Sequence, residues 1–255
     1  SFCLGVTENC VEFAAGLDVG HFFTAGPALW WVLGLYALLG CFALVTSRQL
    51  SWRWQAAAAA LWISIGFGAS TYRTAQPQLQ CTFLAIGHGT CVVIELPGGQ
   101  TLLYDAGSLG SPEGASRSIA SFLWSRGISE IDAVVLSHAD IDHYNAIPGL
   151  LERIPIGTVY VSPLMFDPWA TQGQLTAPNY LRETLLAADV PIEEVWMNDR
   201  LTTAAEDVSI ECLHPPRTGV VGRDNANSIL LCIRYAGHTI LLPGDLESPG
   251  IETVM

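Results

Sequence analysis

The chain has 255 residues, half of which are apolar, and it carries a formal net charge of −13. This length and composition allow a substantial buried core in one or two domains. The acidic balance lacks the basic footprint of most nucleic-acid-binding proteins, and the seven cysteines contain no Cys-x-x-Cys pair that would indicate a structural zinc site. Bound divalent cations would offset part of the negative charge.

Two apolar runs without acidic or basic residues predict a membrane segment over residues 1–72, with transmembrane helices at about 25–45 and 54–72. The first run has 21 residues, which is enough for a helix to cross the hydrocarbon of a bilayer. The second is weaker because alanine and glycine dominate it. Aromatic residues that favour a membrane interface lie near the ends of both runs, whereas the alternative is a buried helical hairpin in a soluble protein.

The charges around these runs predict their orientation. The connection between them carries Arg48 and Arg53, while the segment before them carries Glu8, Glu12 and Asp18. Because basic loops stay on the cytoplasmic side, everything after residue 72 is expected on the extracytoplasmic side of a cell (inner) membrane, in a multi-pass protein.

Residues 73–255 form the second predicted domain, with nine arginines against 21 acids and hence a net charge of −12. Strand and helix patterns alternate along it. The predicted strands are 81–86, 91–96, 101–104, 131–136, 158–161, 208–213, 228–235 and 239–243, and the predicted helices are 116–126, 147–154 and 178–188. Two strand-rich halves, each with helices, predict a layered α/β sandwich.

The stretch SHADIDHYN, residues 137–145, concentrates polar side chains directly after the apolar run IDAVVL. Its ligand-type residues are His138, Asp140, Asp142 and His143. Imidazole nitrogen and carboxylate oxygen both bind divalent first-row metals, and this short spacing lets alternate side chains converge while the adjacent last pair diverges. The pattern indicates two metal ions side by side.

The same stretch has other interpretations. Either aspartate alone is better explained as a cap for a following helix, and chance clustering on a polar loop is a further alternative. A calcium loop does not fit, because the sixth position is Asn145 instead of glycine and the twelfth is Leu151 instead of glutamate.

The HxDxDH pattern resembles the metallo-β-lactamase superfamily signature, commonly HxHxDH, and the resemblance extends over most of residues 79–247. The stretches FLAIGHGTCVVIELPGGQTLLYDAG and DNANSILLCIRYAGHTILLPGDLE, following apolar runs, resemble the extracellular domain of DNA-internalisation competence proteins of the ComEC type. This implies a metallo-β-lactamase-like αββα sandwich preceded by two transmembrane helices.

The resemblance also implies the ligand set. His138 and Asp140 would hold the first ion, Asp142 and His143 the second, and Asp245 in PGDLE would bridge both, so that Asp142 and Asp245 are the expected catalytic carboxylates. An ordinary PGD turn is the alternative for Asp245. The expected cofactors are two divalent ions, manganese, magnesium or zinc, and Asp140 in place of the usual histidine favours the harder manganese or magnesium.

Four further residues match weaker positions. Asp105 would support the ligands without binding metal, and His88 would lie near substrate, although either is equally well explained as a turn residue. Asn225 and Asn227 fall where many relatives place another ligand for the first ion, but structural asparagines at a strand entrance are at least as good an explanation.

The function that the resemblance implies is a membrane-tethered, metal-dependent phosphodiesterase or nuclease that degrades one DNA strand during import. Single-stranded or double-stranded DNA, the membrane and other DNA-uptake components are the expected partners. The alternatives are a hydrolase of a small ester or lactam and a non-catalytic module of a DNA-translocation complex.

Some positions depart from the family pattern. Ala85 and Thr90 stand where relatives usually have acidic residues. The segment that supplies a late histidine ligand is absent before Met255. The second domain is therefore expected either to be truncated at its C-terminal end or to have an incomplete second metal site.

Overall fold

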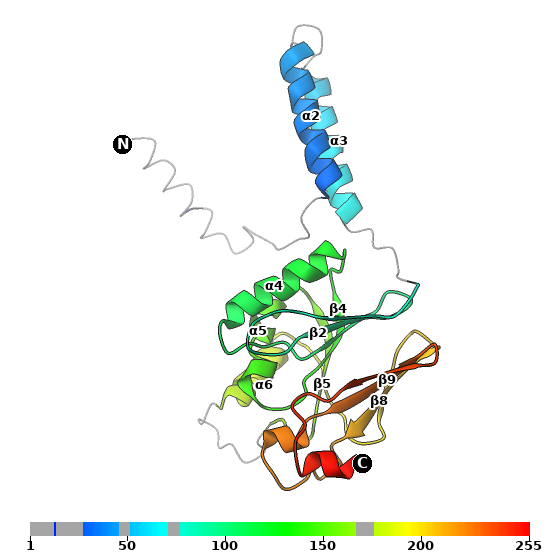
Figure 1. Cartoon of the computed structure of the whole chain (residues 1–255). Helices are drawn as coiled ribbons and strands as arrows, with labels where there is room; N and C mark the ends of the chain where they lie inside the picture. The colour runs from blue at the N-terminus through cyan, green and yellow to red at the C-terminus, as the bar shows by residue number, and fades with distance from the viewer. Residues whose placement is uncertain (1–12, 14–27, 46–51, 71–76, 167–175) are drawn as a thin grey trace.

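The computed structural model describes residues 13, 28–45, 52–70, 77–166 and 176–255. Two helices come first, followed by two packed β-sheets with three α-helices on one side (Figure 1).

The two apolar runs are helical, as α2 (Leu29–Val45) and α3 (Trp52–Ser70), and they lie side by side (Figure 1). Two tryptophans join them: Trp31 Nε1 donates to the Trp62 carbonyl at 2.6 Å, and Trp62 Nε1 donates to the Trp31 carbonyl at 3.3 Å. Their rings stack with centroids 6.4 Å apart. Each of the two tryptophans thus donates its indole N–H to the backbone carbonyl of the other.

The prediction of two transmembrane helices is not supported. Within the described ranges, no helix combines the length and the apolar character that a membrane crossing requires. Helix α2 has 17 described residues, about 26 Å at 1.5 Å per residue, against about 30 Å of hydrocarbon. Helix α3 has 19 residues, but they include Arg53, Gln55 and a run of five alanines.

The first sheet has six strands in the order β1-β2-β3-β4-β5-β6, which is also their chain order. They are β1 (Gln80–Phe83), β2 (Val92–Glu95), β3 (Thr101–Tyr104), β4 (Ile131–Val135), β5 (Ile156–Val161) and β6 (Ile192–Glu194). The first three pair antiparallel and the last four pair parallel. The carboxyl ends of β3 to β6 therefore meet at one edge of the sheet.

Helices α4 (Pro112–Ser125), α5 (Ile147–Leu151) and α6 (Ala177–Ala187) connect the parallel strands. Helix α4 begins four residues before the predicted start. Ser111 Oγ accepts a hydrogen bond from Gly114 N at 3.0 Å, and Pro112 occupies the first turn, where its missing N–H has no cost. The difference arises because Ser111 and Pro112 form a helix-start signal upstream of the apolar spacing on which the prediction was based.

The second sheet has four antiparallel strands in the order β10-β9-β8-β7. They are β7 (Arg200–Leu201), β8 (Val208–His214), β9 (Leu230–Tyr235) and β10 (His238–Leu242). All the predicted strands are confirmed within a few residues. The sequence analysis missed β6 and β7, which have three and two residues and so carry no readable alternation.

Two apolar layers hold the domain together. On one side of the six-stranded sheet, Ile119, Leu150 and Leu181 from the three helices pack on Leu103 and Val134. Between the sheets lies a second layer. Its members include Ile94, Leu102, Tyr104, Ile210, Leu231 and Ile233. In the part of the chain that the structure describes, α-helices pack only on the six-stranded sheet, so three of the four predicted αββα layers are present (Figure 1).

The second layer can be tested with two leucines on neighbouring strands. Leu231 is fully buried between the sheets, whereas Leu241 is 55% exposed. Leu231→Ala is expected to lower the free energy of unfolding by about 2–5 kcal/mol, because it removes buried methyl groups and leaves a cavity. Leu241→Ala should change it by less than about 0.5 kcal/mol in the same urea titration. Equal effects would contradict the layer assignment.

Candidate metal centre

The stretch 137–145, which contains the predicted ligands, follows the carboxyl end of β4. Ser137 and His138 follow the strand, and a 3₁₀ turn, η1 (Ile141–His143), completes the loop. His143 N donates to the Asp140 carbonyl at 3.0 Å, and the His143 carbonyl accepts from Ala106 N at 2.7 Å. These bonds fold the loop back so that both histidines face the same side.

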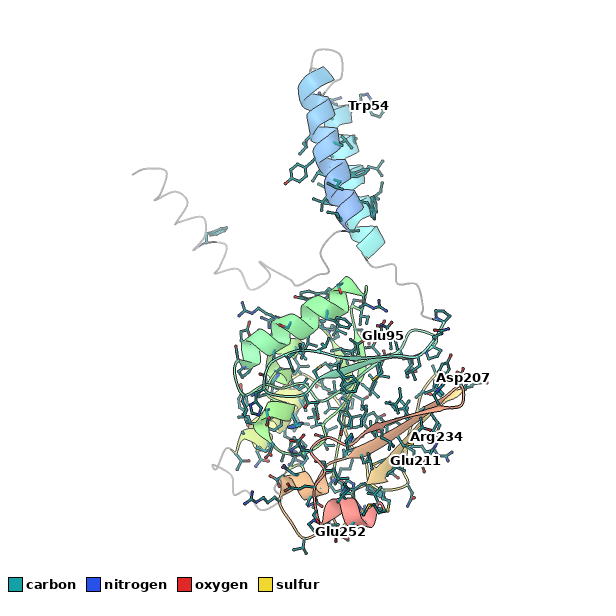
Figure 2. All side chains as sticks on the ribbon, viewed as in Figure 1. Trp54, Glu95, Asp207, Glu211, Arg234 and Glu252 are labelled. Carbon is teal, nitrogen blue, oxygen red and sulfur yellow. The ribbon has the colours of Figure 1, made fainter. Side chains whose placement is uncertain are left out.

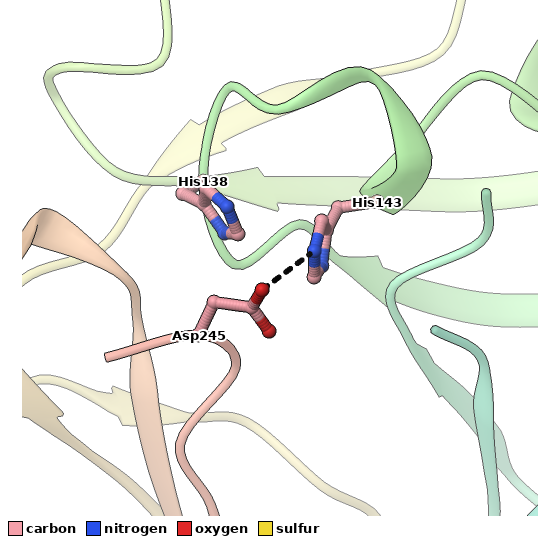
Figure 3. Close-up of side chains that lie close together, drawn as sticks. All are labelled: His138, His143 and Asp245. Atoms are coloured by element: carbon pink, nitrogen blue, oxygen red, sulfur yellow. Dashed lines mark ion pairs between the residues drawn. The ribbon is translucent and has the colours of Figure 1, made fainter. Parts of the chain in front are cut away.

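Three side chains gather where the two sheets meet: His138, His143 and Asp245 (Figure 3). One ligand atom from each lies within 4.8 Å of the other two, and His143 Nε2 is 3.7 Å from Asp245 Oδ2. Because two ligands at about 2.0–2.2 Å from one ion are at most about 4.4 Å apart, a small contraction would bring all three to a single metal.

His138 gives the clearest sign that a cation fits here. Its side chain is buried, and its Nε2 has no hydrogen-bond partner among the described residues. Asp140 Oδ2 is 3.4 Å from this nitrogen, but not in hydrogen-bonding geometry. A buried imidazole nitrogen without a partner is costly, and coordination of a metal would remove that cost. Two imidazoles and a carboxylate are also a suitable ligand set for divalent first-row ions.

Asp105 orients the ligands from beneath. It is fully buried and follows β3, and its carboxylate accepts from Ser137 N at 2.7 Å and from Ser137 Oγ at 2.8 Å. The same carboxylate lies 2.8 Å from His143 Nδ1. If Nδ1 carries the proton that this bond needs, Nε2 is left with its lone pair toward Asp245. Asp105 therefore supports the ligands, as the resemblance implies, and is not merely a turn residue.

The two histidines have opposite pKa shifts. Burial and the neighbouring His143 lower the pKa of His138 below its usual value. Burial also acts to lower the pKa of His143, but the hydrogen bond and charge of Asp105 outweigh it, and that pKa is raised. Since the rings are only 4.1 Å apart, double protonation is disfavoured and His138 keeps a lone pair for a metal.

Asp245 reaches the centre from a different sheet, through the turn after β10. Gly244 has φ +56°, and a Cβ there would come within 2.8 Å of the Ser137 Cβ, so this close approach requires glycine. Asp245 is half exposed, which leaves the centre open on its side. The structure therefore brings Asp245 to the two histidines. Its predicted role as a bridge between two ions stays a prediction.

Asp140 and Asp142 stay outside the three-residue group. Asp140 precedes η1, but its side chain makes no capping hydrogen bond, so the capping explanation does not hold for it. Asp142 is half-buried, and its charge helps to raise the pKa of His143. The structure thus defines one three-ligand group in the described residues. That Asp140 joins His138 on a first ion and Asp142 joins His143 on a second stays a prediction.

Of the three remaining candidates, Asn225, Asn227 and His88, only Asn227 has a clear structural role. Asn227 Oδ1 accepts from Val220 N at 2.7 Å, and Asn227 Nδ2 donates to the Val220 carbonyl at 3.0 Å. Its amide is thus engaged by a loop, as the structural explanation expects. Asn225 is half-buried in η2 (Asp224–Asn227). His88 is exposed, and its backbone carbonyl accepts a hydrogen bond from Leu109 N at 2.7 Å.

Sequence reasoning missed Ser137. Its hydroxyl lies 2.8 Å from Asp105 Oδ2, 2.9 Å from His138 Nδ1 and 3.2 Å from His143 Nδ1, so it joins three members of the centre. The only available signal was its position directly before His138.

The domain is a layered α/β sandwich in which two imidazoles and a carboxylate lie where the two sheets meet. The family profile described as "Metallo-beta-lactamase superfamily" matches residues 85–255. The chain belongs to that superfamily.

Relatives of this chain are distant. It is 29% identical over 136 residues to ComE operon protein 3 of Bacillus subtilis (strain 168), a match that covers 52% of this chain and 16% of that protein. Among solved structures, a Cronobacter sakazakii metallo-beta-lactamase with a HARLDQ motif is 16% identical, with a TM-score of 0.42 over 72% of this chain and 67% of that one. Zn²⁺-bound PqqB from Methylobacterium extorquens is 18% identical, with a TM-score of 0.39 over 60% and 52%.

The role of Asp105 can be tested with Asp132, an aspartate that also joins the neighbouring strands β3 and β4. Asp105→Asn is expected to weaken divalent metal binding about 10–100-fold, because His143 loses the carboxylate that fixes its ring and its tautomer. Asp132 Oδ2 accepts from Thr101 N at 2.7 Å, away from the ligands. Asp132→Asn should leave metal affinity unchanged in calorimetric titrations; equal losses would show that Asp105 acts only through stability.

Proposed function

We propose that this chain hydrolyses phosphodiester bonds with divalent metal held by His138, His143 and Asp245. The observation that supports this most directly is the buried Nε2 of His138, which faces His143 and Asp245 without a hydrogen-bond partner among the described residues. Asp140 and Asp142 are the further ligands in this proposal.

In this proposal the protein's side chains hold and orient the metal ligands, and the ions supply the chemistry. When bound, divalent ions polarise a phosphoryl oxygen and lower the pKa of a water molecule, which removes the need for a protein nucleophile. Asp105 and Ser137 fix the imidazoles from the buried side. Asp245, which is half exposed, borders the side from which a substrate approaches.

The proposed substrate is DNA, and the proposed setting is a DNA-uptake protein in which one strand is degraded during import. The motifs that resemble competence proteins and the similarity to ComE operon protein 3 support this choice. The chain matches only 16% of that protein's length, so uptake and its partner proteins belong to the proposal.

The test of hydrolysis uses single-stranded DNA with manganese, magnesium or zinc added separately. We expect activity with manganese or magnesium that chelation abolishes. Asp245→Asn should lower kcat at least 100-fold, because it removes an anionic ligand. Asp207→Asn, a change of the same kind at an exposed site on the far part of the second sheet (Figure 2), should have no effect.

One outcome would contradict the metal preference, and two would contradict the nuclease. Activity with zinc alone would oppose the preference for harder ions. Hydrolysis of a generic lactam or ester, without cleavage of DNA, would favour the small-molecule alternative. Tight metal binding without hydrolysis of any of these substrates would favour the non-catalytic module.

The proposed location is the inner membrane, with residues 73–255 on the extracytoplasmic side. This rests on Arg48 and Arg53 in the predicted cytoplasmic loop and on the resemblance. Protease added to intact spheroplasts should degrade the later domain. Protection of that domain until the cells are lysed would overturn the orientation.

A further inference from the structure

The loop between β8 and η2, residues 215–223, differs in charge from the rest of its domain. It contains Arg217 and Arg223 and no acidic residue, whereas residues 73–255 together carry −12. We call residues 215–223 the arginine loop. Four other described arginines of this domain pair with carboxylates: Arg117 with Glu113, Arg126 with Glu95, Arg153 with Glu113 and Glu152, and Arg234 with Glu211. Arg182, which lies over the Phe166 ring, and Arg200 have no ion-pair partner among the described acids. Among the described acids, none lies within ion-pair distance of Arg217 or Arg223.

The first end of the arginine loop lies beyond β6. The guanidinium of Arg217 stacks 4.4 Å from the ring centroid of Trp196, which follows β6. Pro215 accepts from Met197 N at 2.7 Å through its carbonyl and so holds the beginning of the loop there. The ring orients an exposed cation on the same sheet edge as the metal centre.

The middle of the arginine loop is held in place next to β5. Gly219 lies against Leu164, a residue that follows β5, and it has φ +70°. Asn227 makes both of its amide hydrogen bonds to the backbone of Val220. The side chain of Val221 is 95% exposed, so the loop presents its outer side to solvent.

The second end of the arginine loop reaches the metal centre. Arg223 directly precedes η2. Shortly after η2, Ile229 N donates to the carbonyl of Ser137, the residue next to His138, at 2.8 Å. On the other side, a Cβ at Gly222 would be 3.3 Å from Pro249, in the segment that follows Asp245. The second end therefore borders the residues around His138 and Asp245.

We propose that the arginine loop is a rim that leads the phosphate backbone of a single nucleic-acid strand to the metal centre, with Arg217 and Arg223 as the phosphate contacts. This inference rests on the proposed phosphodiesterase function. The loop crosses the sheet edge from β6 to β4, which is two strand spacings or about 10 Å. An exposed guanidinium at each end supplies donors in the fork geometry that phosphate oxygens accept.

The rim explains how an acidic domain can approach a polyanion. Contacts to phosphates are local, and charges farther than about 10 Å are largely screened at 0.1 M salt. The paired arginines elsewhere are neutralised by their carboxylates, whereas the two rim arginines keep their charge for a ligand. The metal centre then needs to hold only the phosphodiester that is cleaved.

The test compares two double variants of the 255-residue chain. Arg217→Gln/Arg223→Gln removes the rim charges. Arg117→Gln/Arg234→Gln is the control, because it removes two exposed arginines elsewhere; Figure 2 shows Arg234 beside Glu211 on the second sheet. Binding of a fluorescein-labelled 20-nucleotide oligothymidylate is measured by anisotropy in chelator, and hydrolysis of bis(p-nitrophenyl) phosphate is measured with manganese.

The rim variant should bind the oligonucleotide about tenfold more weakly. The slope of log Kd against log salt should fall by about 1.4, since each phosphate contact to a single strand contributes about 0.7. The control should bind within twofold of the unmodified chain. Hydrolysis of the small diester should also stay within twofold in both variants, because that substrate reaches only the metal centre.

Unchanged oligonucleotide binding in the rim variant would overturn the proposal, and so would an equal loss in the control. Polyglutamate binding as tight as that of the oligonucleotide would overturn the assignment to nucleic acid. If the unmodified chain hydrolyses neither DNA nor the small diester, the proposed function fails. The anisotropy measurement in chelator does not depend on hydrolysis, so it still tests whether the arginine loop binds the oligonucleotide.

Discussion

The buried carboxylate of Asp105 is the constraint on which the centre depends. It receives hydrogen bonds from the backbone and the hydroxyl of Ser137, and it lies in hydrogen-bonding distance of His143 Nδ1. An ionised group with no exposed surface is stable only if it is paired or hydrogen-bonded, and these contacts meet that need. The ligand loop is therefore fixed to the end of β3, and its two imidazoles point to one place before any ion binds.

The second sheet completes the centre through the same residues. Ser137 also accepts a hydrogen bond from Ile229 N through its carbonyl, at 2.8 Å, and the Ile229 carbonyl accepts from Tyr104 Oη at 2.6 Å. Both bonds are buried between the sheets and join the ligand loop to the entrance of β9. Since β9 pairs with β10, the position of Asp245 after β10 is set by the register that packs the two sheets. The packing of the two sheets thus also determines where the three side chains meet.

The sequence predicted the alternation of strands and helices because strands such as β2 and β3 are apolar and fully buried, β8 alternates buried with half-buried residues, and each helix of the domain has an apolar side. It predicted the meeting of His138, His143 and Asp245 only through the resemblance, since nothing local in PGDLE separates a ligand from an ordinary turn. The short strands β6 and β7 carry too few residues for a pattern. The position of the arginine loop could not be predicted from the sequence, because it depends on long-range contacts with Trp196 and Leu164. The prediction of transmembrane helices relied on the lack of charge in the two apolar runs and gave less importance to helix length and alanine content. The described helices do not support that prediction.

The central claim is that His138, His143 and Asp245 jointly hold a divalent ion. Crystals of the chain soaked in manganese, measured at the manganese absorption edge, test it directly through an anomalous-difference map. The account predicts a peak at coordination distance, about 2.0–2.3 Å, from Nε2 of both histidines and from the Asp245 carboxylate. A map without a peak between these three side chains, or with manganese bound only at other carboxylates, would contradict it.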